Sequence, residues 1–226
     1  MANRDFIVFD FETGSRNPHK TQPTQIAALA LDGRNLSMKG TFNSEIRPIL
    51  NDEAAIAAGL DPIEDGALKV TGKNRKDLAK APTLKSVWKK FCTFVDKYNW
   101  KKDPFFNPIP VGFNIIGFDM IIVNRLCQEY GPFDDARQQQ KIFSKIHKCD
   151  VMDNMHMWTE GDPSIRSISM DTLRDRMGLS KENAHDALQD VKDTANIFIK
   201  LLKTHRAVYQ NIELDKAFAN GNLYVK

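Results

Sequence analysis

Apolar residues near the start of the chain form a short continuous run that predicts a buried strand. Phe6–Phe9 are aromatic or β-branched residues, which are enriched in strands. A second strand is expected over Gln25–Leu31 and a third over Lys39–Ile46, with the turn signal Asp32-Gly33 between them. No segment of helix length separates the three strands. They therefore predict an antiparallel meander rather than a β-α-β unit.

Helical periodicity is clearest in two later segments. Thr83 is expected to cap a helix that runs to about Tyr98, with its apolar residues on one face. A long amphipathic helix is expected from about Ala184 to Lys203. The other expectations, in chain order, are a short helix over 51–59, an irregular polar segment over 61–82, a strand over 109–113, a helix over 118–130, a polar helix over 134–146, a strand over 149–152 with a short Met-rich helix after it, and a helix from Ser169 to Met177 ended by Gly178.

Two carboxylates interrupt the apolar pattern where the first strand ends. Asp10 and Glu12 are two positions apart, so both side chains are expected on the same side of that strand. Neighbouring carboxylates repel each other and are costly to bury, and a divalent cation would remove that cost. The simpler alternative is that Glu12 and Thr13 are only the first polar residues of a loop.

Two further acids have a reason to be partly buried. Asp119 opens the helix expected over 118–130, and Asp190 lies at the edge of the apolar stripe of the last helix. The same helical geometry directs Asp186 and Asp193 further toward solvent. His185 stands at the mouth of this helix, five residues before Asp190. Taken alone, Asp119 is equally well explained as an acid at a helix N-terminus, and His185 as a capping residue.

Composition narrows the class of protein without identifying it. The chain has 226 residues, 42% hydrophobic and 27% charged, which is typical of a globular protein and is compatible with one α/β domain. A net charge of +3 permits a nucleic acid partner but does not require one. Three scattered cysteines and the absence of an apolar signal core or a membrane-length apolar run favour a cytoplasmic protein without membrane contact.

The order and spacing of three motifs resemble the DEDDh, or DnaQ-like, 3′→5′ exonuclease family, and most closely its phage-type exonuclease A group. The motifs are Asp10-Phe11-Glu12-Thr13 with Thr24-Gln25-Ile26 after it, Asn114-x-x-Gly117-Phe118-Asp119, and His185-Asp186-Ala187-Leu188-Gln189-Asp190. Each motif is weak alone, but a chance match of all three in this order is improbable. The resemblance implies an RNase H-like α/β fold with a central mixed five-stranded sheet, including the antiparallel three-strand meander, flanked by helices. It also implies one exonuclease domain over 1–226, with a core at about 5–203 and a C-terminal extension over 204–226.

The resemblance implies a chemistry as well as a fold. Asp10, Glu12, Asp119 and Asp190 would bind two Mg²⁺ ions, which Mn²⁺ can replace, and Glu12 would count among the catalytic residues. His185 would be the general base that takes a proton from the attacking water, a role that suits an imidazole pKa near neutrality. The residues implied in substrate binding are Thr13, Thr71, Gly72, Asn114 and Phe118.

The sequence departs from many family members at two places. Phe113 stands where many relatives have a histidine before the asparagine of the second motif. The substrate loop often reads H-G-I-T in the family, whereas Val70-Thr71-Gly72-Lys73 stands here. The apolar wedge that separates the terminal bases in such relatives is therefore not expected from these residues. The basic run Lys73–Lys76 could steer a phosphate backbone, although short basic runs are usually only solvated.

The expected activity is removal of 5′-mononucleotides from the 3′ end of DNA, mainly single-stranded. An RNA-trimming enzyme of the oligoribonuclease or RNase T kind is the alternative, because the residues reveal no contact to a 2′-OH. A catalytically silent binding module would have no need of mutually repelling acids. A metal-dependent phosphatase would not explain the spacing from His185 to Asp190. Protein partners and oligomeric state cannot be read from the sequence.

Overall fold

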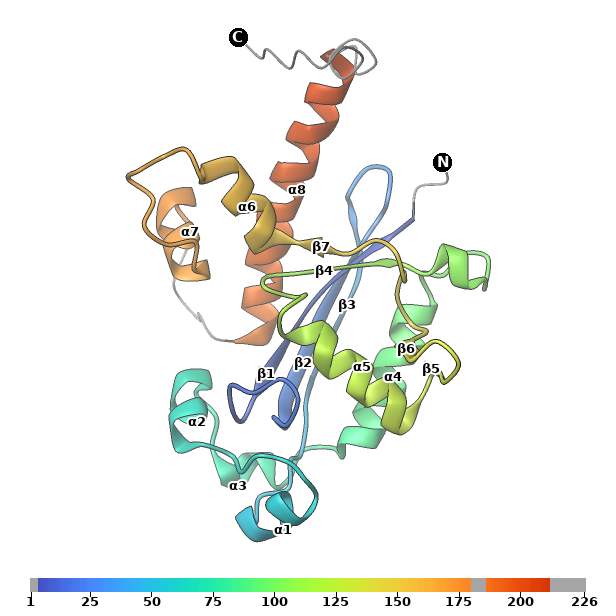
Figure 1. The fold of residues 1–226 in the computed structure, drawn as a ribbon, viewed down its shortest axis with the longest axis vertical. Coiled ribbons are helices and arrows are strands. Elements are labelled where there is room, and N and C mark those ends of the chain that lie inside the picture. The colour runs from blue at the N-terminus through green and yellow to red at the C-terminus, as the bar shows by residue number, and fades with distance from the viewer. Residues whose placement is uncertain (1–3, 180–185, 212–226) are drawn as a thin grey trace.

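A five-stranded mixed sheet lies at the centre of the computed structural model, which describes residues 4–179 and 186–211 (Figure 1). The strands follow the order β3-β2-β1-β4-β7. They are β1 (Phe6–Thr13), β2 (Pro23–Leu31), β3 (Met38–Glu45), β4 (Ile109–Gly112) and β7 (Cys149–Asp150). The first three form an antiparallel meander, and β4 and β7 then add in parallel to β1. The predicted mixed sheet with its meander is confirmed.

Helices cover both faces of this sheet. They are α1 (Asp52–Ala57), α2 (Asp65–Thr71), α3 (Arg75–Leu78), α4 (Leu84–Asp96), the 3₁₀ turn η1 (Pro104–Phe106), α5 (Asp119–Tyr130), α6 (Val151–Thr159), α7 (Met170–Met177) and α8 (Ala187–Asn211). The helices α4 and α5 pack on one face, and α6, α7 and α8 pack on the other. Figure 1 shows α1, α2 and α3 together beyond the end of the sheet at which β1 stops. No helix in the described part of the chain is long and apolar enough to cross a membrane.

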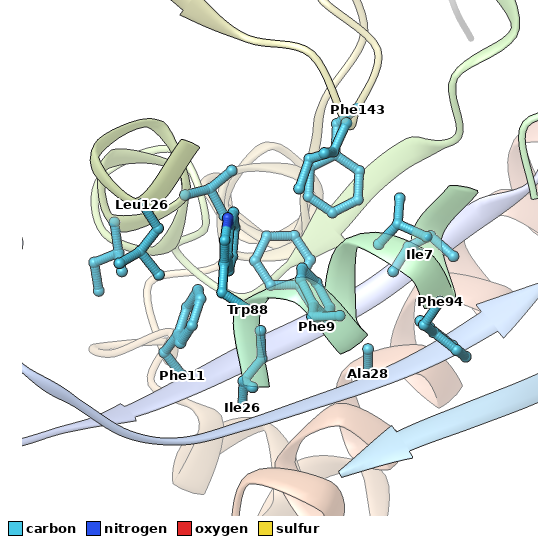
Figure 2. Close-up of a cluster of buried hydrophobic side chains, with 14 of the residues drawn as sticks. Ile7, Phe9, Phe11, Ile26, Ala28, Trp88, Phe94, Leu126 and Phe143 are labelled. Carbon is cyan, nitrogen blue, oxygen red and sulfur yellow. The ribbon is translucent and has the colours of Figure 1, made fainter. Parts of the chain in front are cut away.

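The alternation of side chains along β1 distributes its residues between the two faces. Ile7, Phe9 and Phe11 join the core beneath α4 and α5, where Figure 2 shows them with Trp88 and Phe143. Phe6 and Val8 have the opposite parity and join the core beneath α8. Asp10 and Glu12 share that second parity, so β1 directs both carboxylates toward the α8 side of the sheet.

Two segments fold differently from what the sequence predicts. The stretch over 61–82 is not irregular, because it contains α2 and α3. Leu68 and Leu78 each anchor one of these short helices in a small separate core with Ile63. One buried leucine per helix is too few to produce a helical hydrophobic period, so the sequence over 61–82 does not indicate these helices.

The segment over 134–146 is not helical, contrary to the prediction. It contains a two-stranded hairpin of β5 (Phe133–Asp134) and β6 (Gln139–Gln140), followed by a loop. The Gln140 side chain bonds the backbone of Phe143, and Phe143 stacks on Phe9 with ring centroids 5.1 Å apart. This tertiary contact outweighs the weak helical preference of a polar segment.

Candidate active site

Three carboxylates from two distant elements meet at the end of β1. Asp10 and Glu12 of β1 and Asp190 of α8 each offer a carboxylate oxygen, and these oxygens lie within 4.8 Å of one another. All three residues are partly buried, and the cluster lies on the face of the sheet that α8 covers. The strand period and the helix period each bring acids to this point, as the sequence predicts.

A turn between β4 and α5 brings a fourth acid beside this cluster. Asp119 begins α5, is only 3% exposed, and accepts a hydrogen bond of 3.0 Å from the backbone N–H of Phe11. The turn itself is held by Asp150, whose carboxylate accepts from the N–H groups of Asn114 and Ile116, each at 3.0 Å. Asp119 is therefore fixed next to β1, although it does not belong to the tight group of three.

Burial and mutual repulsion make Asp10, Glu12 and Asp119 hard to ionise. Burial and the neighbouring Asp190 raise the pKa of Asp10 to about 7, against a smaller lowering by Arg174. Burial, Asp10 and Asp190 raise the pKa of Glu12 to about 8, while the charge of Lys73 lowers it. Burial and Asp10 also raise the pKa of Asp119 well above its ordinary value. The cluster therefore favours the binding of positive charge.

Arg174 supplies part of that charge from within the protein. Its side chain on α7 is fully buried. Its guanidinium donates to Asp193 at 2.8 Å, to Asp171 at 3.2 Å and to the cluster residue Asp190 at 2.5 Å. This corrects one expectation, because Asp193 is 3% exposed and paired rather than directed toward solvent. Sequence reasoning missed Arg174, since nothing in the sequence near 174 indicates a partner in α8.

A hollow beside the carboxylates collects most of the predicted substrate-binding residues. Its lining includes Glu12, Thr13, Thr71 and Phe118. Residues of α2, among them Val70, form the facing wall. The hollow has a volume of about 660 Å³, which is within the range that holds small ligands.

The remaining predicted residues lie elsewhere or are not described. Gly72 ends α2 in a left-handed conformation and is not part of the hollow's lining. Asn114 has a φ of +56° and occupies the β4–α5 turn, a backbone conformation that asparagine tolerates better than most residues. His185 lies outside the described residues. Asp186, the first residue described after it, accepts a hydrogen bond from Gln25 at 3.2 Å.

The donor atoms fit a hard divalent cation. All the groups in the cluster are carboxylate oxygens, which are the ligands that Mg²⁺ and Mn²⁺ prefer, and no thiol or imidazole of the described residues joins them. Their raised pKa values show that the protein has not fully compensated their charge. The residues present are therefore those that a divalent metal site requires.

Solved structures with the same fold support the architecture. The chain aligns with exonuclease I at a TM-score of 0.69 and 20% identity, covering 89% of this chain and 41% of that one. It aligns with Escherichia coli exonuclease I in complex with a dT13 oligonucleotide at a TM-score of 0.67 and 21% identity, covering 92% and 43%. The mixed five-stranded sheet and its flanking helices are therefore the RNase H-like fold of these exonuclease structures.

Sequence comparison identifies the family. The RNase T family model, described as Exonuclease, matches residues 7–198, and the chain belongs to this family. It is 22% identical over 203 residues to DNA polymerase III subunit epsilon of Aquifex aeolicus, covering 90% of this chain and 83% of that protein. It is also 22% identical over 199 residues to the PolC-type DNA polymerase III of Caldanaerobacter subterraneus subsp. tengcongensis, of which it spans only 12%. The resemblance to DnaQ-like exonucleases is confirmed.

We predict that the metal-free protein loses stability as the pH rises from about 5 to about 8. The pKa values of Asp10 and Glu12 are about 7 and 8 in the folded protein but ordinary in the unfolded chain, so the folded state binds more protons in this window. A divalent cation binds the deprotonated site and should raise Tm more at pH 8 than at pH 5.5. Thermal unfolding in EDTA and in MgCl₂ at both pH values measures this. An equal shift at both pH values would contradict the prediction, and Glu12→Gln should weaken the pH dependence.

We predict that Arg174→Met lowers the free energy of unfolding by about 3–5 kcal/mol, because it removes a fully buried guanidinium that pairs with the buried Asp193 and with Asp190. Arg176→Met is the matched control on the exposed side of α7, with an expected change within about 0.5 kcal/mol. Urea unfolding in metal-free buffer measures both variants. A loss below about 1 kcal/mol for Arg174→Met would show that the ion pairs contribute little.

Proposed function

We propose that the protein is a metal-dependent exonuclease that hydrolyses phosphodiester bonds at the 3′ end of DNA, mainly single-stranded, and releases 5′-mononucleotides. The observation that carries this proposal is the convergence of Asp10, Glu12 and Asp190 beside a hollow large enough for a terminal nucleotide. Its class rests on membership of the exonuclease family over residues 7–198. We also propose that residues 1–226 form one exonuclease domain.

Four acids would hold the metal ions in this proposal. Asp10, Glu12 and Asp190 form the tight group, and Asp119 would join through its carboxylate oxygen Oδ2, because Oδ1 accepts the N–H of Phe11. A pair of Mg²⁺ or Mn²⁺ ions, when bound there, supplies a water of lowered pKa and stabilises the leaving 3′ oxygen. The chain spans only 41% of the exonuclease I chain whose fold it shares, so the activity of that longer protein does not carry over. The chemistry proposed here is therefore argued from the residues of this chain.

The chain's own residues have separate roles around that centre. His185 would take the proton from the attacking water, since an imidazole with a pKa near 7 is an effective general base at neutral pH. Thr13, Thr71 and Phe118 would hold the terminal nucleotide, because they line the hollow next to Glu12. The half-buried ring of Phe118 offers an apolar surface to a base or a sugar. Gly72 and Asn114 would shape the loops on either side.

Single-stranded DNA is the substrate that we favour. A neighbouring structure, Escherichia coli exonuclease I, is described in complex with a dT13 oligonucleotide, and its fold superposes over 92% of this chain. RNA is the alternative substrate. A protein distinguishes the two through the 2′-OH, so the sugar preference is an experimental question.

One assay tests the proposal as a whole. Oligonucleotides of DNA and of RNA, labelled at the 3′ or the 5′ end, are incubated with the protein in Mg²⁺ or in EDTA. We expect release of 5′-mononucleotides from the 3′ end, in Mg²⁺ only, and faster for single-stranded DNA than for a blunt duplex. Activity that persists in EDTA, or internal cleavage, would contradict the proposal. Faster cleavage of RNA would instead support the RNA-trimming alternative.

The proposed role of His185 makes a sharper prediction. His185→Ala should lower kcat by about 10²–10⁴-fold, which is typical of the loss of a general base. Mn²⁺ affinity, measured by isothermal titration calorimetry, should change little, because His185 is not one of the proposed metal ligands. His205→Ala is the control, because His205 lies on the far part of α8, where its Nε2 accepts a hydrogen bond from Nε1 of Trp158 on α6. Normal turnover in His185→Ala would remove histidine from the chemistry.

A further inference from the structure

The basic run Lys73–Lys76 does not act as a uniform solvated patch. Arg75 is used within the protein, where it donates to the carbonyl of Ile63 at 2.6 Å and pairs with Asp65 at 3.1 Å. Lys76 is exposed on α3. Lys73 is half-buried and directed inward. The three basic residues thus have three different environments, and that of Lys73 is next to the carboxylate cluster.

Gly72 and Gln25 determine where the Lys73 side chain lies. Gly72 ends α2 with a φ of +66°, and the N–H of Lys73 then bonds the carbonyl of Leu68 at 2.9 Å. The Lys73 ammonium donates to Oε1 of Gln25 at 2.5 Å. The Gln25 amide nitrogen donates to Asn43 at 2.9 Å and to Asp186 at 3.2 Å, so its oxygen is left to face the ammonium.

The pairing of β1 with β2 brings this contact to the reacting site. Gln25 pairs directly with Glu12 in the antiparallel register, so the two side chains stand on the same face of the sheet. The charge of Lys73 is close enough to Glu12 to lower its pKa. Thr71, two residues before Lys73, lines the hollow that Glu12 also lines. Lys73 therefore lies at the border between the carboxylate cluster and the hollow.

We propose that Lys73 binds a backbone phosphate of the nucleic acid strand, at the linkage that lies over Glu12 when a terminal nucleotide fills the hollow. This inference rests on the proposed exonuclease function and adds a substrate-binding residue to it. The ammonium is well suited to this contact, because Gln25 orients it without neutralising it. No carboxylate oxygen in the described part of the chain lies within 4.0 Å of it.

The charge balance of the site supports the same assignment. Two divalent cations would offset the four proposed acid ligands, and Arg174 is already shared among Asp171, Asp190 and Asp193. The charge of an incoming phosphate therefore needs a further partner. A lysine held at the edge of the site supplies a point charge for it without occupying a metal position.

The test compares Lys73→Gln with Lys76→Gln, two variants of equal net charge from the same basic run. Two measurements compare the variants. Steady-state kinetics give KM and kcat for a single-stranded DNA oligonucleotide in Mg²⁺, and anisotropy gives the affinity for the same 5′-fluorescein-labelled oligonucleotide in EDTA, between about 50 and 200 mM salt. Mn²⁺ affinity is measured separately by isothermal titration calorimetry. For Lys73→Gln we expect KM to rise about 5–20-fold with kcat within about threefold. The slope of log affinity against log salt should fall by about 0.7, the value for one lost phosphate contact on a single strand.

The controls separate the possible failures. Lys76→Gln should match the wild type in both measurements, and Lys73→Arg should restore most of the affinity. If Lys73→Gln and Lys76→Gln behave alike, the proposal for Lys73 is wrong while the exonuclease function stands. If Lys73→Gln changes Mn²⁺ affinity but leaves the salt slope unchanged, Lys73 serves Glu12 instead of the strand, and the proposal is also wrong. A wild-type protein that cleaves no nucleic acid but binds the oligonucleotide through Lys73 would overturn the function alone.

Discussion

Burying several carboxylates at one point is the constraint on which the rest of this structure depends. Asp10, Glu12, Asp119 and Asp190 lie around the end of β1, where burial and mutual repulsion oppose the ionisation of Asp10, Glu12 and Asp119. Such a cluster persists in a folded protein only if positive charge or protons compensate it. Arg174 compensates one side of the cluster permanently, and Lys73 lies near the other. The negative charge that these two residues do not compensate makes the site suited to exchangeable cations.

The fold meets this constraint by separating its hydrophobic and acidic layers along single elements. On β1, the residues of one parity build the aromatic core under α4 and α5, while the other parity changes from Phe6 and Val8 to Asp10 and Glu12. On α8, the apolar stripe docks on the same face and carries Asp190 to the acids. The hydrophobic cores on the two faces of the sheet stabilise the fold, and the acids lie at the end of the sheet where these cores stop.

The sequence predicts the parts of this arrangement that depend on local periods. Strand and helix periodicity, together with the family motifs, predict the mixed sheet and the approach of Asp10, Glu12 and Asp190. The N-terminal caps of α4 and α7 follow from the residue types at those positions. The structure of the segment 134–146 cannot be predicted in this way, because it depends on the contact of Phe143 with Phe9, which is distant in the sequence. The burial of Asp193 also has no local signal, since it depends on Arg174 arriving from another helix. Long-range pairing of single side chains is the common feature of both failures.

The two basic residues at the site differ in a way that matches their surroundings. Arg174 is fully buried, and its planar guanidinium binds three carboxylates at once, which suits a permanent structural counter-charge. Lys73 is half-buried, and its ammonium is held by one contact with the side-chain amide of Gln25, which it can exchange for another acceptor. The proposed function requires a site that binds and releases an anionic strand, and one fixed and one exchangeable positive charge suit that requirement. Arg174 contacts Asp190 and the charge of Lys73 acts on Glu12, so these two residues would supply both.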